Sequence, residues 1–230
     1  MKSSYYKYFA ALLLFGSNGI VASNINLPSY EIVLLRLLLG SLFLITVFTV
    51  SRQRFTFYRN KHTCLYLFIS ASAMGASWML LYEAYQQVGI SIASLAYYCG
   101  PVIVMILSPF LFRETLTWPK IAGFLTVLAG MCLVNLQALD EGKTIWGLFC
   151  GLMSAFMYAL MVTANKKAKP ESGLENSLLQ LVIGSFIVVA FVSMQKNFVL
   201  SLTTIDWIPV LLLGLLNTGI GCYLYFSSIT

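Results

Sequence analysis

The chain has 230 residues, of which 59% are hydrophobic and only 10% are charged, and its mean hydropathy is +0.84. A soluble domain is about half apolar and a quarter charged, so this composition excludes an ordinary soluble protein. The net charge of +6 then has to be explained within a membrane. Because irregular backbone cannot face lipid, we expect an all-α integral membrane protein.

Eight apolar segments follow one another along the chain, each close to the roughly 20 residues that cross a bilayer as a helix. They are Tyr6–Asn24, Tyr30–Val50, Cys64–Ala84, Ser91–Phe112, Trp118–Leu136, Ile145–Ala164, Ser177–Met194 and Trp207–Ser228. The first segment begins a series and does not precede soluble sequence, so it does not resemble a signal peptide. We predict a polytopic helical bundle of eight transmembrane helices.

The basic residues predict the orientation of the chain. If the N-terminus is cytoplasmic, eleven of the fourteen Lys and Arg residues lie on the cytoplasmic side. They are Lys2, Lys7, Arg52, Arg54, Arg59, Lys61, Arg113, Lys120, Lys166, Lys167 and Lys169. This is the positive-inside pattern, and it accounts for the net charge without a nucleic-acid partner. We expect a multi-pass protein of the plasma (inner) membrane.

An internal repeat appears when the chain is shifted by 144 residues. The matches are Leu34-Leu35-Arg36-Leu37 with Leu178-Leu179-Gln180-Leu181, Gly40-Ser41 with Gly184-Ser185, Gly75 with Gly219, and Ala11 with Ala155. The repeated unit contains five helices, so the second copy must enter the membrane inverted, an arrangement common in alternating-access transporters. We predict a first five-helix repeat over 1–137 and an incomplete second repeat of three helices over 138–230.

Several short motifs resemble those of the EamA family of the drug/metabolite transporter superfamily. They are Gly16-Ser17-Asn18, Arg36, Pro101, Glu114-Thr115-Leu116-Thr117, Gly123, Gly130 and Tyr158-Ala159. The resemblance covers the whole chain, and the stretch 101–130 is its most specific part. It implies ten helices as two inverted five-helix repeats, and the export or import of amino acids and related metabolites.

The chain departs from that family pattern at its end. Thr230 corresponds to Gln86 of the first copy, so the counterparts of Pro101 and Glu114 are missing. We expect the five-plus-five repeat with its last two helices absent, either because the sequence is truncated or because eight helices suffice. An open side would expose polar groups to lipid, so this form should be unstable or should associate as a homo-oligomer.

Arg36 is the first candidate site residue. A charge inside a membrane helix is costly and usually faces the bundle interior or a water-filled cavity. It could contact an anion or carboxylate of the substrate, or act as a gate partner for Glu83. The structural alternatives are a salt bridge to Glu83 or Glu31, or snorkelling to the outer surface. Glu83 itself could couple protons or simply cap its helix in solvent.

Other candidates surround this position. Trp78 and Tyr82 share one helix face, and Tyr97 precedes the break expected at Pro101, which cannot donate to the carbonyl of Tyr97. Aromatic faces suit amino acids or cationic amines, although packing also explains many membrane aromatics. Asn18 could bind substrate or bond a neighbouring helix. The predicted substrate-binding residues are Asn18, Arg36, Trp78, Tyr82 and Tyr97, and the predicted break or gate residues are Glu83, Pro101 and Glu114. Glu114 has the alternative of pairing with Arg113 or Lys120.

These features favour a transporter of small metabolites, most of all amino acids or related amines and organic solutes, that works by alternating access. A non-transporting membrane-embedded binding or regulatory partner is the alternative. A membrane enzyme fits less well, because the one histidine, His62, lies in a basic connection and the sequence contains no GxSxG, HExxH or P-loop pattern. The five cysteines show no metal spacing, and we expect neither a metal site nor a cofactor.

Overall fold

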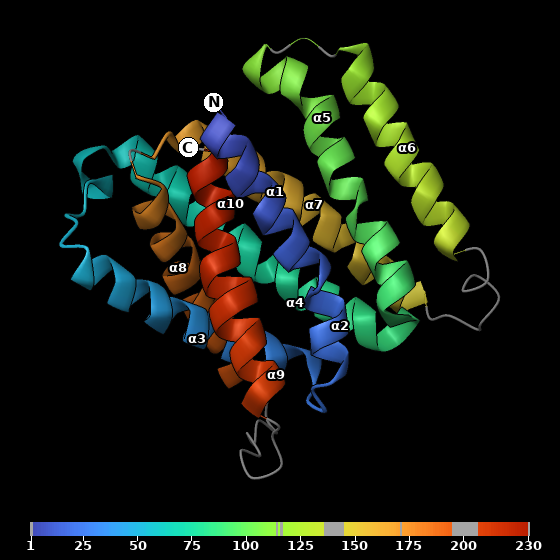
Figure 1. Ribbon diagram of the computed structural model, residues 1–230, viewed down its shortest axis with the longest axis horizontal. Helices are drawn as coiled ribbons and strands as arrows, with labels where there is room; N and C mark the ends of the chain where they lie inside the picture. The colour runs from blue at the N-terminus through green and yellow to red at the C-terminus, as the bar shows by residue number, and fades with distance from the viewer. Residues whose placement is uncertain are drawn as a thin grey trace.

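The computed structural model describes residues 2–113, 115, 117–135, 145–170, 172–194 and 207–229, and every regular element in these ranges is helical (Figure 1). The elements are α1 (Lys2–Gly16), α2 (Asn18–Ser23), α3 (Ser29–Val50), the short 3₁₀ turn η1 (Phe57–Arg59), α4 (Lys61–Tyr97), α5 (Cys99–Phe112), α6 (Trp118–Asn135), α7 (Ile145–Ala168), α8 (Gly173–Ser193), α9 (Trp207–Leu211), the π-helical η4 (Leu212–Ile220) and α10 (Gly221–Ile229).

Five helical stretches of the described chain are long and apolar enough to cross a membrane. They are Tyr30–Val50, Lys61–Phe112, Ile145–Ala168, Gly173–Ser193 and Trp207–Ser228. The all-helical membrane architecture expected from the composition is therefore observed. The count of eight crossings and the repeat stay predictions.

Gly89 divides the long helix α4. Its φ of 78° and ψ of 162° are non-helical, and glycine adopts such angles without the steric cost that a side chain adds. In Figure 1 the chain descends along α4 and, after the end of α4, turns upward into α5. The 52-residue stretch Lys61–Phe112 is long enough for two crossings at about 20 residues each.

Two of the predicted segments contain breaks. The first segment, expected as one helix over Tyr6–Asn24, is divided at Ser17, where α1 ends and α2 begins, so Asn18 starts a short helix. The fourth segment breaks at Tyr98, between α4 and α5, three residues before Pro101. This position agrees with the lost hydrogen bond between the missing Pro101 N–H and the carbonyl of Tyr97.

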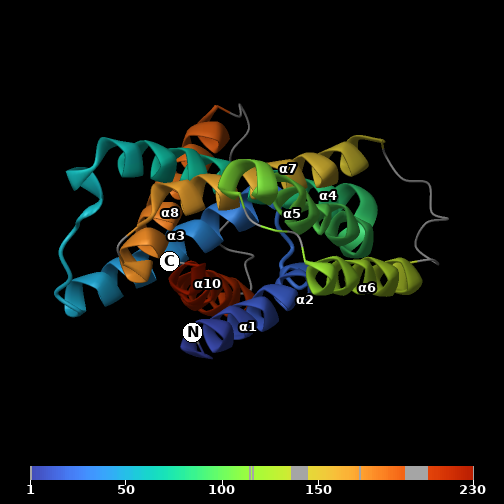
Figure 2. The same cartoon turned by 90° about the horizontal axis from the view of Figure 1, so that it is seen from above.

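Helices α4 and α7 lie against each other in the middle of the bundle (Figure 2). Two serines of α4 form hydrogen bonds to α7. Ser70 Oγ donates to the Met161 carbonyl at 2.9 Å, and Ser77 Oγ donates to the Ser154 carbonyl at 2.8 Å. Small polar side chains of this kind let membrane helices approach closely and satisfy their hydroxyls across the interface.

A glycine contact sets the crossing of α4 and α8. A Cβ added to Gly75 would lie 3.1 Å from the Gly184 carbonyl oxygen, whereas a Cβ added to Gly123 of α6 would meet no atom within 4 Å. Gly75 therefore faces α8, while Trp78 and Tyr82 of the same helix face Arg36 in α3.

Alanine at these two glycines should move stability in opposite directions. Gly75→Ala should destabilise the protein by about 1–3 kcal/mol because a packed interface must widen. Gly123→Ala should be neutral or stabilising by up to about 1 kcal/mol, because alanine is the better helix former. Thermal unfolding of both variants in detergent tests the crossing, and equal melting temperatures would contradict it.

Candidate functional site

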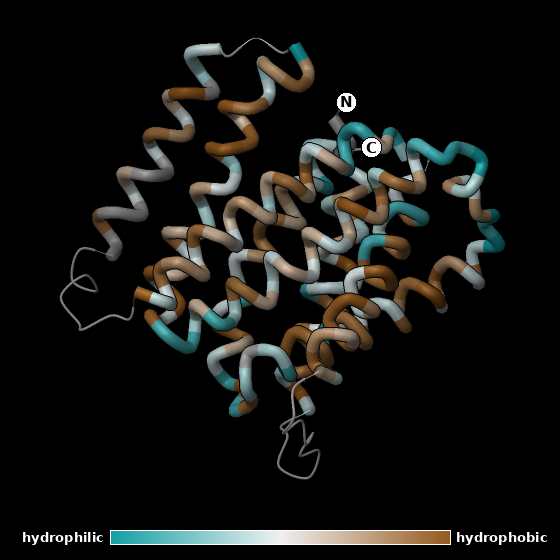
Figure 3. Tube along the Cα trace, turned by 180° about the vertical axis from the view of Figure 1, so that it is seen from behind, coloured by the Kyte–Doolittle hydropathy of each residue, from teal (hydrophilic) through white to brown (hydrophobic). Residues whose placement is uncertain are grey.

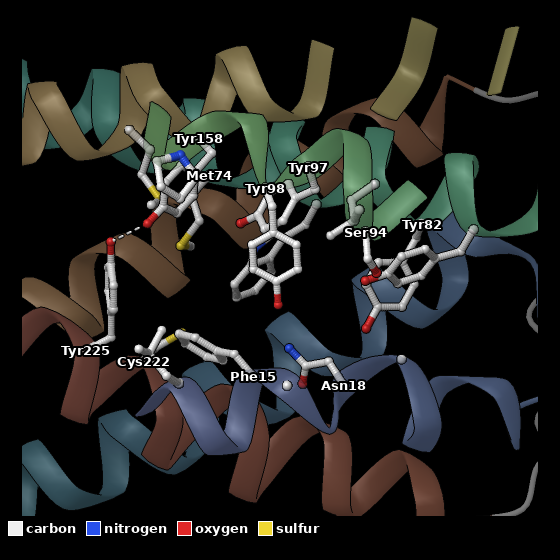
Figure 4. A pocket seen from close by; sticks show the side chains of 18 of the residues that line it. Phe15, Asn18, Met74, Tyr82, Ser94, Tyr97, Tyr98, Tyr158, Cys222 and Tyr225 are labelled. Atoms are coloured by element: carbon white, nitrogen blue, oxygen red, sulfur yellow. Dashed lines mark hydrogen bonds between the residues drawn. The ribbon is translucent and has the colours of Figure 1, made fainter. Parts of the chain in front are cut away.

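A cavity of about 200 Å³ lies between α1–α2 on one side and α4, α5, α7 and α10 on the other. Figure 4 shows Phe15 and Asn18 on one wall, with Tyr97 and Tyr98 opposite. Tyr98 is 37% exposed, so the cavity reaches the protein surface. Typical pockets for drug-sized ligands measure about 300–1,000 Å³, and this smaller space suits a small metabolite.

The structure brings the five predicted substrate-binding residues together around this cavity. Its lining includes Asn18, Arg36, Trp78, Tyr82 and Tyr97, and also Pro101. Glu83 is not part of the lining; its Oε1 accepts a hydrogen bond from Gln87 Nε2 at 3.2 Å. Glu114 lies outside the described residues.

Arg36 is the charged residue of the cavity wall and is only 2% exposed. Its Nε donates to Thr218 Oγ1 at 3.0 Å, and its Nη1 donates to the Tyr82 hydroxyl at 2.6 Å. The guanidinium carbon lies 4.1 Å from the centre of the Trp78 ring, which is a close cation–π contact. Three elements, α3, α4 and η4, therefore fix one guanidinium group.

The partners of Arg36 leave part of its charge unsatisfied. Neither Glu31 nor Glu83 is among its described partners, and no Asp or Glu lines the cavity. Its Nη2 is buried and has no hydrogen-bond partner in the described structure. Burying a charge without a counter-ion costs several kcal/mol, so a negatively charged group that reached this nitrogen would be stabilised by it.

Asn18 has two different surroundings. Its Oδ1 accepts a hydrogen bond at 2.9 Å from Asn217 Nδ2, which also reaches Ser17 Oγ at 2.9 Å and the Leu14 carbonyl at 3.0 Å. The amide nitrogen of Asn18 is directed toward the cavity (Figure 4). Its oxygen therefore bonds a neighbouring helix, as one alternative expected, and its nitrogen faces the cavity; substrate binding by Asn18 stays a prediction.

Comparison with known proteins shows the family of the chain. The profile of the EamA-like transporter family matches residues 3–136 and 145–230. The chain belongs to this family. It is 26% identical over 230 residues to the uncharacterized transporter YxxF of Bacillus subtilis (strain 168), with 97% of this chain and 72% of that protein covered.

A second relative and a solved structure are also similar to the chain. An uncharacterized transporter in the sor 3′ region of Acidianus ambivalens is 26% identical over 132 residues, which cover 57% of this chain and 51% of that protein. A crystal structure aligns with all of this chain and 79% of its own, at 18% identity and a TM-score of 0.78. At that identity the second match shows a shared fold only.

Aromatic side chains extend the cavity of this EamA protein from α4 to α10. The Tyr97 and Tyr158 rings are 5.4 Å apart, and the Tyr158 and Tyr225 hydroxyls are 3.0 Å apart, the bond drawn in Figure 4. The Phe15 ring of α1 lies 5.9 Å from that of Tyr225. The resulting wall offers ring faces and hydroxyl tips to an apolar or aromatic solute.

Sequence reasoning did not select Thr218, Asn217, Tyr98 or Tyr225 as site residues. The adjacent polar pair Asn217-Thr218 inside an apolar segment was the available signal. The sequence did not predict the π-helical turn that orients both residues. In this turn Thr218 Oγ1 donates a hydrogen bond to the Leu213 carbonyl, five residues earlier, at 2.7 Å.

Removing the Asn217 amide should loosen the break in the first segment. Asn217→Ala deprives three acceptors on or beside α1 and α2 of their donor, so we expect a loss of about 1–3 kcal/mol in unfolding free energy. Asn24→Ala is the matched control, because the exposed Asn24 amide bonds only the Ile20 carbonyl of its own helical turn. Thermal unfolding compares the two, and an equal effect would contradict the role given to Asn217.

Proposed function

We propose that this EamA protein transports small carboxylate-bearing metabolites, amino acids foremost, and that Arg36 binds the carboxylate. The observation that carries the proposal is the buried Arg36 side chain in the cavity wall, whose Nη2 has no hydrogen-bond partner among the described residues. Family membership and the two similar transporters support membrane transport in general. The substrate class comes from the geometry of the cavity.

The charge of the cavity distinguishes between substrate types. Among the described residues, its lining contains one fixed positive charge, Arg36, and no Asp or Glu. An amine that lacks a carboxylate would be repelled by the guanidinium in a low-dielectric space. A carboxylate would satisfy Nη2 by a charge-assisted hydrogen bond, and the Asn18 amide nitrogen could supply a second donor. An ammonium group would find the faces of the aromatic wall.

The aromatic wall favours solutes with an apolar or aromatic body. Tyr97, Tyr98, Tyr158 and Phe15 present rings to the cavity, and Trp78 already stacks with Arg36. A small zwitterion with an apolar side chain would place its carboxylate at Arg36 and its body against these rings. Amino acids are the simplest solutes of that description.

Alternating access by an inverted repeat is the mechanism that we propose for this transporter. Two contacts support the repeat. A Cβ on Gly40 would lie 2.8 Å from Thr218 Cγ2, and a Cβ on Gly184 would lie 3.1 Å from Met74 Cε. The shift of 144 residues carries Gly40 onto Gly184 and Met74 onto Thr218, so the two contacts are counterparts. Rocking of one repeat against the other would expose Arg36 to each side in turn.

Uptake by proteoliposomes tests the role of Arg36. Arg36→Gln removes the charge-assisted bond, worth about 1.5–3 kcal/mol, so uptake of a carboxylate substrate should fall roughly ten- to hundredfold. Arg36→Lys keeps the charge but loses the planar fork, and its loss should be intermediate. Amino-acid mixtures serve as the first substrates, with flux normalised to the amount of folded protein.

A second, less disruptive pair of variants distinguishes a loss of substrate binding from a loss of folding. Tyr82→Phe removes the hydroxyl bonded to Arg36 and should weaken uptake, whereas Tyr223→Phe, which is outside the cavity lining, should behave as wild type. Unchanged kinetics in both Arg36 variants would refute the binding role. Substrate binding without flux in the wild-type protein would instead indicate a non-transporting binding partner.

The orientation can be tested separately, on a cysteine-free background. We propose a cytoplasmic N-terminus in the plasma membrane, because the basic residues gather in the connections around Arg54 and Lys169. Arg54→Cys and Lys169→Cys should react with a membrane-impermeant maleimide only after permeabilisation, and Gly142→Cys should react in intact cells. Labelling of all three from the same side would refute the proposed topology.

A further inference from the structure

A second, polar cavity of about 340 Å³ lies at one end of the bundle and shares no lining residue with the first. Its walls come from two regions distant in sequence. One is residues 56–63 with Leu67, before and within the start of α4, and the other is residues 167–170, 175 and 176, at the end of α7 and the start of α8. Figure 3 shows hydrophilic segments gathered at this end, beside the two termini. Since it is built from helix ends, the cavity would sit at the level of the lipid headgroups.

Basic side chains dominate this cavity. Arg59, Lys167 and Lys169 line it together with His62. Within the described part of the chain, no carboxylate forms an ion pair with the first three. Lys167 Nζ lies 5.9 Å from the centre of the Tyr66 ring, which leaves its donors available. Three permanent positive charges therefore converge from two connections.

Among the residues that the structure describes, Glu175 is the carboxylate that lines the cavity, and its oxygens already have partners. Glu175 is 2% exposed; its Oε1 accepts hydrogen bonds from the Thr56 and Phe57 amides at 2.6 and 2.9 Å, and its Oε2 accepts one from Thr56 Oγ1 at 2.6 Å. With these three donors it holds the turn η1 and does not pair with the basic side chains. The described lining of the cavity therefore carries an excess of positive charge.

The floor of the cavity is apolar. Leu67 and Ala168 form a small buried cluster with Leu179, and Phe57 packs against it. On the outer face of the same part of α4, Leu65 and Phe68 are more than half exposed. A basic cavity above exposed apolar side chains matches a molecule with an anionic head and acyl chains, because the chains could lie along α4 while the head enters the cavity.

We propose that this cavity binds a phosphate group, and the apolar surroundings favour the headgroup of an anionic phospholipid as its source. Arg59 offers the planar fork that phosphates accept in two parallel hydrogen bonds, and Lys167 and Lys169 add point charges. A bound phosphate would join the α3–α4 connection to the α7–α8 connection. This inference does not depend on the substrate of the Arg36 cavity.

Ligand-induced thermal stabilisation in neutral detergent tests the proposal. Phosphatidylglycerol, phosphatidylcholine and inorganic phosphate are titrated in turn against the wild-type protein. We expect phosphatidylglycerol to raise the melting temperature and phosphatidylcholine to have no effect. Stabilisation by inorganic phosphate as well would support a phosphate site that soluble anions can also fill, and stabilisation by neither phosphatidylglycerol nor phosphate would overturn the proposal.

Variants that remove positive charge test whether phosphatidylglycerol binds at this cavity. In Arg59→Gln/Lys167→Gln the apparent affinity for phosphatidylglycerol should fall about tenfold or more, since two charge-assisted contacts are lost. Lys166→Gln is the matched control, because Lys166 is next to Lys167 but its Nζ lies over the Phe112 ring, 4.3 Å from its centre, and does not line the cavity. Equal loss of affinity in the control would show general surface attraction and overturn the site.

Discussion

The structure depends most on the guanidinium group of Arg36, which is buried among apolar helices and has no carboxylate partner among the described residues. Its desolvation is costly, and the protein offsets that cost with the Tyr82 hydroxyl, the Trp78 ring and the Thr218 hydroxyl. None of these partners carries a negative charge, so the offset is incomplete. In the proposed function, the remaining nitrogen binds an anionic group of the transported solute and so offsets the loss of its hydration.

The π-helical stretch η4 connects this charge to the rest of the cavity. Its neighbouring residues Asn217 and Thr218 point to different partners, the break at Ser17 between α1 and α2 and the side chain of Arg36. π-helical turns are rare and frequently occur at functional sites. If substrate binding changed the hydrogen bonds of Arg36, Thr218 and Asn217 would therefore pass the change to α1 and α2. These two helices form one wall of the cavity.

Much of this arrangement could be read from the sequence, because a bilayer leaves few options. The apolar composition predicted a helical membrane protein. Because a charge inside a membrane helix is costly, Arg36 was predicted to face the interior of the bundle. The convergence of Asn18, Trp78, Tyr82 and Tyr97 followed from helix faces, and the structure places them on one cavity. The helix break falls at Tyr98 and not at Pro101 itself, since proline weakens the turn before it. The contributions of Thr218 and Tyr225 depend on helix–helix contacts and on π-helical geometry, which local residue patterns do not encode.

The most direct test of the account compares ligands that differ only at the carboxylate. An amino acid that the protein binds should be measured beside its carboxamide, which has nearly the same size and keeps the ammonium group, by equilibrium binding to the purified protein. If the Arg36 guanidinium binds the carboxylate, the carboxamide should bind about ten- to hundredfold more weakly, as expected for the loss of about 1.5–3 kcal/mol, and the difference should disappear in Arg36→Gln. Equal affinities of the two ligands for the wild-type protein would contradict it.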